Sequence, residues 1–185
     1  MIRSALHPIP VYFDRYINKT DDVEILEAIR ISLKELDNIP LQEWKALGDR
    51  IYAPGKWMIA DILQHLIDTE RVFTYRALAF ARADAQAMPF FPEDDYAKEA
   101  KAKARNIEDL VEELKILHQS LALFYRSLTP KMLDRRGIGF KGEYSVAAIG
   151  FMLPGHQRWH FDIIEERYMP LLDNAGSSKF HSKIN

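Results

Sequence analysis

The sequence contains no cysteine and little glycine, and both shortages limit what the protein can be. Without cysteine it cannot form a disulfide framework, a thiolate metal site, an iron–sulfur cluster or a cysteine nucleophile. Glycine accounts for only 8 of the 185 residues, and apolar residues recur at spacings of three and four rather than two. This period predicts an all-α protein with negligible sheet.

The chain also lacks a long hydrophobic run and a cluster of charge of one sign. Its apolar stretches are broken by charges or proline well short of the roughly 18 residues that cross a bilayer, and residues 1–10 do not form a secretory signal. The 25 basic and 27 acidic residues are interspersed and leave a net charge of −2, without the basic face that nucleic acid requires. We therefore expect a soluble cytoplasmic protein that binds neither nucleic acid nor a membrane.

Four amphipathic segments predict four helices, over about residues 21–37, 57–83, 106–128 and 145–169, with Asn106 and Ser145 as caps. Two other segments are expected to connect them: 41–56, and 84–96, whose Met88-Pro89-Phe90-Phe91-Pro92 run favours a packed loop or lid. The fold expected is a single four-helix bundle domain over residues 1–172. The polar tail 173–185 is expected to be disordered.

Two histidines share the inward stripe of the last predicted helix. His156 and His160 lie one turn apart, so their rings can converge on one point, as in a helical two-histidine metal clamp. His65 lies on the inward stripe of helix 57–83, where Thr69 and Arg76 are the other polar positions. Three imidazoles between facing helices predict a metal site with coordination positions left for water or substrate.

The alternative for each histidine is structural, because a lone buried histidine is more often a hydrogen-bonded core residue than a ligand. Burying three imidazoles among apolar residues, however, costs desolvation unless something coordinates them. His7, His118 and His181 lie off these stripes or in terminal segments and are assigned no chemistry.

Carboxylates contribute less to the prediction. Asp61 and Asp68 lie within one turn of His65 and could orient its ring, or could equally be solvated at the helix edge. Glu70 and Glu166 have no assigned orientation, so no general base is predicted. A di-iron bundle needs paired Glu-x-x-His motifs, which the sequence lacks, so we expect a mononuclear site for zinc, nickel, iron or manganese.

Several short motifs stand out by their order and spacing along the chain. They are Tyr52-Ala-Pro-Gly-Lys-Trp57, Asp61-Ile-Leu-Gln-His65-Leu-Ile-Asp-Thr-Glu70, Tyr144-Ser-Val, Gly155-His156-Gln-Arg-Trp-His160 and Glu166-Arg-Tyr168. Together they make residues 20–172 resemble the DinB-like superfamily. The resemblance implies a four-helix bundle of up-up-down-down type, a divalent metal held by His65, His156 and His160, and a homodimer.

Members of this family with known activity include thiol-dependent S-transferases and a maleylpyruvate isomerase that uses low-molecular-weight thiols, and others are described as metal-dependent hydrolases. Two features of this chain depart from the family pattern. Gln157 stands where many relatives have glutamate, and Pro154-Gly155 introduces a kink that is either tolerated or aims His156 at the metal.

The leading hypothesis is a metal-dependent hydrolase or thiol S-transferase acting on a small-molecule substrate. The metal would activate water or a low-molecular-weight thiol, and the lack of cysteine means that a cosubstrate must supply that thiol. Phe73, Leu153 and the Phe90-Phe91 loop are expected to line the pocket. The competing hypothesis is a non-catalytic, metal-stabilised bundle that serves as a binding or dimerisation module.

Overall fold

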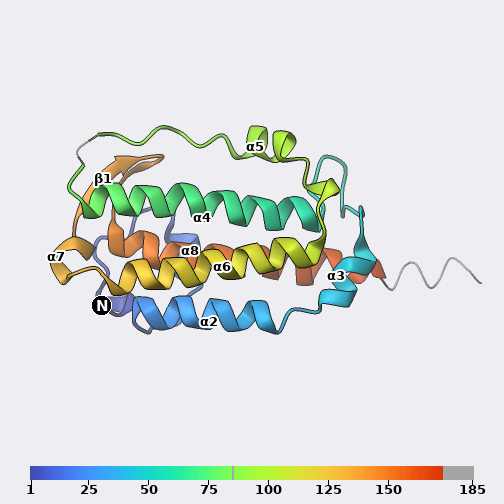
Figure 1. Ribbon diagram of the computed structural model, residues 1–185, viewed down its shortest axis with the longest axis horizontal. Coiled ribbons are helices and arrows are strands. Elements are labelled where there is room, and N and C mark those ends of the chain that lie inside the picture. The colour runs from blue at the N-terminus through green and yellow to red at the C-terminus, as the bar shows by residue number, and fades with distance from the viewer. Residues whose placement is uncertain (85, 173–185) are drawn as a thin grey trace, which may run out of the picture.

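Four long helices dominate the computed structural model, which describes residues 1–84 and 86–172 (Figure 1). They are α2 (Ile25–Asp37), α4 (Ile59–Ala81), α6 (Ile107–Arg126) and α8 (Val146–Ile163), and they confirm the predicted all-α four-helix bundle. The expected tail 173–185 lies outside the described residues. Among the described residues, no helix combines the length and apolar character needed to cross a bilayer.

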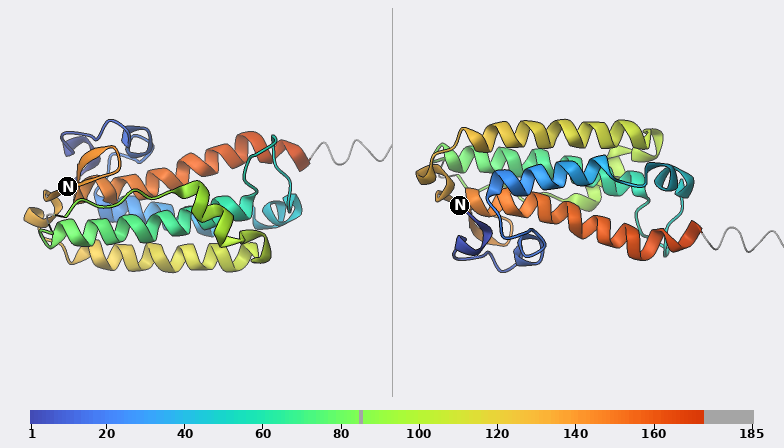
Figure 2. Two further views of the ribbon diagram at one scale, coloured as in Figure 1. Left: turned by 90° about the horizontal axis from the view of Figure 1, so that it is seen from above. Right: turned by 90° about the horizontal axis from the view of Figure 1, so that it is seen from below.

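The helix directions differ from the up-up-down-down order that the resemblance implied. Helices α2 and α8 run one way and α4 and α6 run the other, which makes the order up-down-down-up (Figure 1). The Gln157 amide bonds the Ser32 carbonyl on parallel α2, whereas the end of α4 at Phe80 contacts Tyr144, just before α8 begins. The long 82–106 connection allows α4 and α6 to run parallel, because it returns the chain along the bundle (Figure 2).

The connections contain more regular structure than the sequence suggested. The short helical elements are η1 (Arg3–Ala5), α1 (Asp14–Ile17), α3 (Leu41–Leu47), α5 (Glu93–Ala100), η2 (Ala102–Ala104), α7 (Pro130–Leu133) and the π-helical turn η3 (Ile164–Tyr168). Residues 86–92 form an extended strap along the bundle that leads into α5 (Figure 1). Strands β1 (Arg136–Gly139) and β2 (Gly142–Ser145) form an antiparallel hairpin, a small exception to the expected absence of sheet.

Helix α8 starts and continues for identifiable reasons. The Ser145 hydroxyl accepts a hydrogen bond from the Ala148 N–H at 3.1 Å, as expected of an N-cap, whereas the Asn106 side chain makes no such bond at the start of α6. Pro154 lies inside α8 without ending it, and the helix extends through both histidines.

A polar layer divides the core of the bundle into two apolar clusters. One cluster includes Ile29, Phe80 and Leu121 and the other includes Leu36, Leu63 and Leu114. The buried polar side chains between these positions come from all four long helices, and we call them the polar layer: Ser32, His65, Thr69, Glu70, His118, His156 and Gln157. Buried polar groups need partners, so this layer is where function is to be sought.

Candidate metal centre

The three predicted histidines meet in the polar layer. Nε2 of His156 lies 3.2 Å from Nε2 of His65 and 3.1 Å from Nε2 of His160. One nitrogen of each ring lies within 4.8 Å of the other two, and this is the one such cluster of histidine and carboxylate ligands among the described residues. Helix α4 supplies one ring and α8 supplies two that are one turn apart, as the helical spacing predicted.

The nitrogen separations fit a divalent metal. Three nitrogens bonded to one ion at about 2.05 Å would lie about 3.3 Å apart in a tetrahedral arrangement and about 2.9 Å apart in an octahedral one. The separations of 3.1 and 3.2 Å from His156 fall between these values, and the nitrogens of His65 and His160 lie within 4.8 Å of each other, so the donor set can hold an ion without selecting its coordination number. The other ring nitrogen of His65, Nδ1, is buried and has no hydrogen-bond partner among the described residues. The orientation of the ring is therefore not explained by a hydrogen bond at Nδ1.

The surroundings keep these histidines neutral. Burial lowers the pKa of His65 to about 3, with a smaller contribution from His160, and burial lowers the pKa of His160 to about 4. Burial, followed by the two neighbouring rings, also holds the pKa of His156 well below its usual value. At neutral pH each ring therefore offers an unprotonated nitrogen, which is the form that binds a metal.

The depressed pKa values predict that metal-free protein loses stability in acid. Between the usual histidine pKa of 6.5 and the folded values near 3 and 4, the unfolded chain binds more protons than the native one. The free energy of unfolding should then fall as the pH drops from 6.5 to 4, by up to about 1.4 kcal/mol per pH unit for each histidine. Urea unfolding of chelator-treated protein across this range measures the slope, and a flat profile would contradict the buried neutral cluster.

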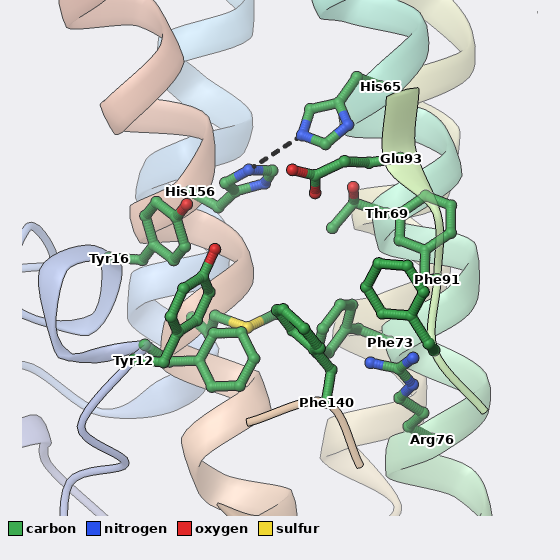
Figure 3. A pocket seen from close by; sticks show the side chains of 13 residues that line it. Tyr12, Tyr16, His65, Thr69, Phe73, Arg76, Phe91, Glu93, Phe140 and His156 are labelled. Carbon is green, nitrogen blue, oxygen red and sulfur yellow. Dashed lines mark hydrogen bonds between the residues drawn. The ribbon is translucent and has the colours of Figure 1, made fainter. Parts of the chain in front are cut away.

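An aromatic cavity of about 90 Å³ opens beside the cluster (Figure 3). His65 and His156 form one end, and the walls carry aromatic side chains from α1, α4, the strap and the hairpin: Phe13, Tyr16, Phe73, Phe90, Phe91 and Phe140. The predicted contributions of Phe73 and the Phe90-Phe91 loop are therefore confirmed. Leu153 was predicted to line the pocket, but it is packed in the apolar core and is not among the lining residues.

Two polar groups at this cavity were not predicted. Glu93, the first residue of α5, points its carboxylate toward His65 and His156, and burial, followed by Asp94, raises its pKa (Figure 3). The Tyr16 ring packs edge-on against His156 at 4.8 Å between centroids, and burial raises the pKa of its hydroxyl to about 12. Neither segment has a helical repeat long enough to reveal which residue points inward, although segment 84–96, which contains Glu93, was expected to form a packed loop or lid.

The two aspartates considered for orienting His65 have other partners. Asp61 accepts a hydrogen bond from the Met58 N–H at 3.2 Å at the start of α4, and Asp68 accepts one from the Gln64 amide at 3.0 Å. No hydrogen bond joins either carboxylate to His65 within the part of the chain that the structure describes. Glu166, whose orientation was left open, is exposed in η3.

His118 was assigned to a flank of its helix, but it is buried. Its Nδ1 lies 2.6 Å from Oε2 of Glu70, and both side chains are almost fully enclosed between α6 and α4. The prediction was wrong because α6 packs against two neighbouring helices, which makes its buried face wider than the apolar stripe. Glu70, whose orientation the sequence left open, places a carboxylate inside the bundle.

The cluster borders a second cavity of about 210 Å³. His160 lies in its wall together with Trp57, Lys56 and Asp94, so this cavity is more polar than the aromatic one. Glu93 borders the first cavity and its neighbour Asp94 borders the second. The three histidines are thus accessible from two sides.

These observations agree with comparisons with known proteins. The sequence profile of the DinB superfamily matches residues 25–164, from the first residue of α2 to the residue after α8. The chain belongs to the DinB superfamily. The match spans every helix that supplies a histidine but not the N-terminal segment that carries Tyr16.

A solved structure shares the fold. YfiT from Bacillus subtilis superposes with a TM-score of 0.66 at 18% sequence identity, over 86% of this chain and 87% of that one. It is described as a probable metal-dependent hydrolase with an unusual four-helix bundle topology. No protein of curated function matches the sequence.

Proposed function

We propose that this protein is a metal-dependent enzyme whose single divalent ion is held by His65, His156 and His160. The observation that carries the proposal is the convergence of three neutral imidazoles between two cavities, with Nε2 of His156 at 3.2 and 3.1 Å from the other two Nε2 atoms. A structural zinc site would be closed by a fourth protein ligand, and no cysteine or carboxylate joins the cluster among the described residues. When bound, such an ion activates a coordinated water or thiol as a nucleophile.

The chain's own residues suit hydrolysis at this site. The Glu93 carboxylate faces the histidines and, with its raised pKa, is placed to accept and return a proton. The Thr69 hydroxyl lines the cavity, is buried and has no hydrogen-bond partner among the described residues, so it is free to bond a substrate. The aromatic walls exclude water and bind an apolar group.

A thiol S-transferase is the second candidate, and the second cavity favours it. A reaction between two substrates needs two approaches to one centre, and His160 borders a cavity separate from the one at His65 and His156. Lys56 in that wall would supply a cation for an anionic thiol, and Asp94 in the same wall opposes it. The homodimer and the thiol partner stay predictions.

The test is a metal-dependent activity assay of the full chain. Protein stripped with chelator and reloaded with zinc, nickel, iron or manganese is offered aryl esters and amides, and separately thiols with an alkylating acceptor. We expect about one metal per chain and turnover that chelator abolishes. Ester hydrolysis without thiol supports the hydrolase, whereas thiol-dependent turnover supports the transferase.

Glu93→Gln separates catalysis from metal binding. We expect kcat to fall about 100-fold while the metal content is unchanged, because the amide cannot accept a proton. Asp95→Asn is the matched control, since Asp95 lies two residues further along α5 and is exposed. Failure to bind any of the four metals, or turnover unaffected by chelator, would overturn the proposed function.

A further inference from the structure

Arg76 is one of the polar residues on the inward stripe of α4. It lies at the end of the aromatic cavity that is remote from the histidines (Figure 3). His65, Thr69, Phe73 and Arg76 follow one another at spacings of four, four and three residues, so one face of α4 forms a complete wall of the cavity. The wall thus carries the candidate metal ligand at one end and a cation at the other.

Arg76 is buried without an anionic partner. It is 2% exposed, and its guanidinium donates to the Tyr144 hydroxyl at 3.2 Å and to the Pro89 carbonyl at 2.7 Å. The guanidinium also lies 4.4 Å from the centre of the Phe73 ring. These partners are neutral, and within residues 1–84 and 86–172 no carboxylate forms an ion pair with it.

A buried guanidinium without a counter-ion is costly, and it has five N–H donors of which the protein's own acceptors use two. Its two contacts hold it in place: Tyr144 fixes it from the hairpin side and Pro89 from the strap. A carboxylate entering the cavity would supply the missing charge and accept from the remaining donors in a charge-assisted pair.

We propose that the cavity selects an amphipathic anion: a ligand with a carboxylate at Arg76, an apolar or aromatic body between Phe73 and Phe140, and its reacting group at the histidines. The eleven residue-to-residue steps from His65 to Arg76 span roughly 16.5 Å along the helix axis, and the arginine side chain leans back toward His65. The substrate is therefore an extended molecule rather than a compact one. This inference deepens the proposed function and rests on it for the position of the reacting group.

Glu93 and Arg76 give the two ends of the cavity opposite charges. The Glu93 carboxylate lies at the histidine end, and Arg76 is the cation at the opposite end (Figure 3). An anionic group is repelled by Glu93 and attracted by Arg76, so the charges orient the ligand with its uncharged end toward the histidines.

The test compares the binding of 4-phenylbutyrate with that of its uncharged analogue 4-phenylbutyramide by titration calorimetry. Each ligand is titrated into the full chain in two forms, one stripped of metal and one loaded with zinc. We expect the carboxylate to bind at least about 10-fold more tightly in both forms. Arg76→Met should abolish this preference and Arg76→Lys should keep part of it. Arg82→Met, at the exposed C-terminal end of the same helix, should leave it unchanged.

Each outcome separates this inference from the metal proposal. Equal affinities for acid and amide, or a preference that survives Arg76→Met, overturn the inference. A preference that appears only with zinc places the carboxylate on the metal, which overturns the inference and leaves the proposed function intact. If the protein fails to take up any of the four metals but still prefers the acid, the Arg76 subsite is supported and the proposed function is overturned. Should Arg76→Met fail to fold, a shift of the wild-type Arg76 Nε–H signal with acid but not amide decides the question.

Discussion

Alanine in place of His156 is expected to lower the affinity of the protein for zinc or nickel by more than about 100-fold, the upper end of what loss of a ligand's hydrogen-bond partner typically costs. His156 is the central ring of the cluster, since its Nε2 is the atom that lies near both other nitrogens. Its removal leaves two nitrogens on different helices. Competition against a chromogenic chelator measures the affinity, and elemental analysis gives the stoichiometry.

The matched control for this experiment is His118→Gln. His118 lies in the same polar layer and is as deeply buried, but it contacts Glu70 instead of the cluster. This variant should lose stability because it disturbs a buried pair, and it should still bind one metal per chain. Equal metal affinity in His156→Ala and wild-type protein would show that the ion, if any, binds elsewhere.

Gly155→Ala is expected to destabilise the fold by about 3 kcal/mol or more, at the upper end of overpacking effects. A β-carbon at this position would lie 1.9 Å from the carbonyl oxygen of Tyr16 and 2.6 Å from its carbonyl carbon. These are backbone atoms of α1, so the clash cannot be relieved by a side-chain rotation. Helix α1 would have to move away from α8, and Tyr16 would move away from His156. Urea denaturation measures the loss, and Tyr16 is expected to become solvent-exposed.

A second glycine of the same helix provides the comparison. In Gly150→Ala the nearest atoms are side-chain carbons of Tyr125 and Ile25, at 2.7 and 2.8 Å, and these can shift. We therefore expect a smaller loss of stability than in Gly155→Ala. The reverse order would contradict the view that Gly155 is required for the close approach of α1. This packing also gives the Pro154-Gly155 pair a role that the kink hypothesis did not include.

The helical repeat accounts for most of what could be predicted from the sequence. Spacing on one helix determines which side chains share a face, so His156 and His160 could be paired with confidence, and a bundle interior brings His65 opposite them. Helix direction could not be derived in the same way, because a long connection permits either orientation of the helix that follows it. The order implied by resemblance was therefore wrong, whereas the three histidines lie together as expected.

The parts of the site that were missed come from segments without a repeat. Glu93 reaches the cavity from the first position of α5, directly after the strap, and Tyr16 from a single helical turn, and in both places side-chain direction depends on how the chain crosses the bundle. Arg76 was visible on the stripe, but its partners Tyr144 and Pro89 are 68 and 13 residues away in sequence. Such contacts depend on tertiary packing that no local pattern encodes.

The layer of polar side chains across the middle of the bundle also fixes how the helices align lengthwise. Apolar cores tolerate sliding, because one leucine can replace another in a neighbouring gap. If α6 slipped by one turn, His118 would leave Glu70 and face a leucine, with an ionisable group stranded on each side. The same residues that create a place for chemistry therefore penalise every misaligned assembly of the four helices, as a buried polar residue does in selecting the register of a coiled coil.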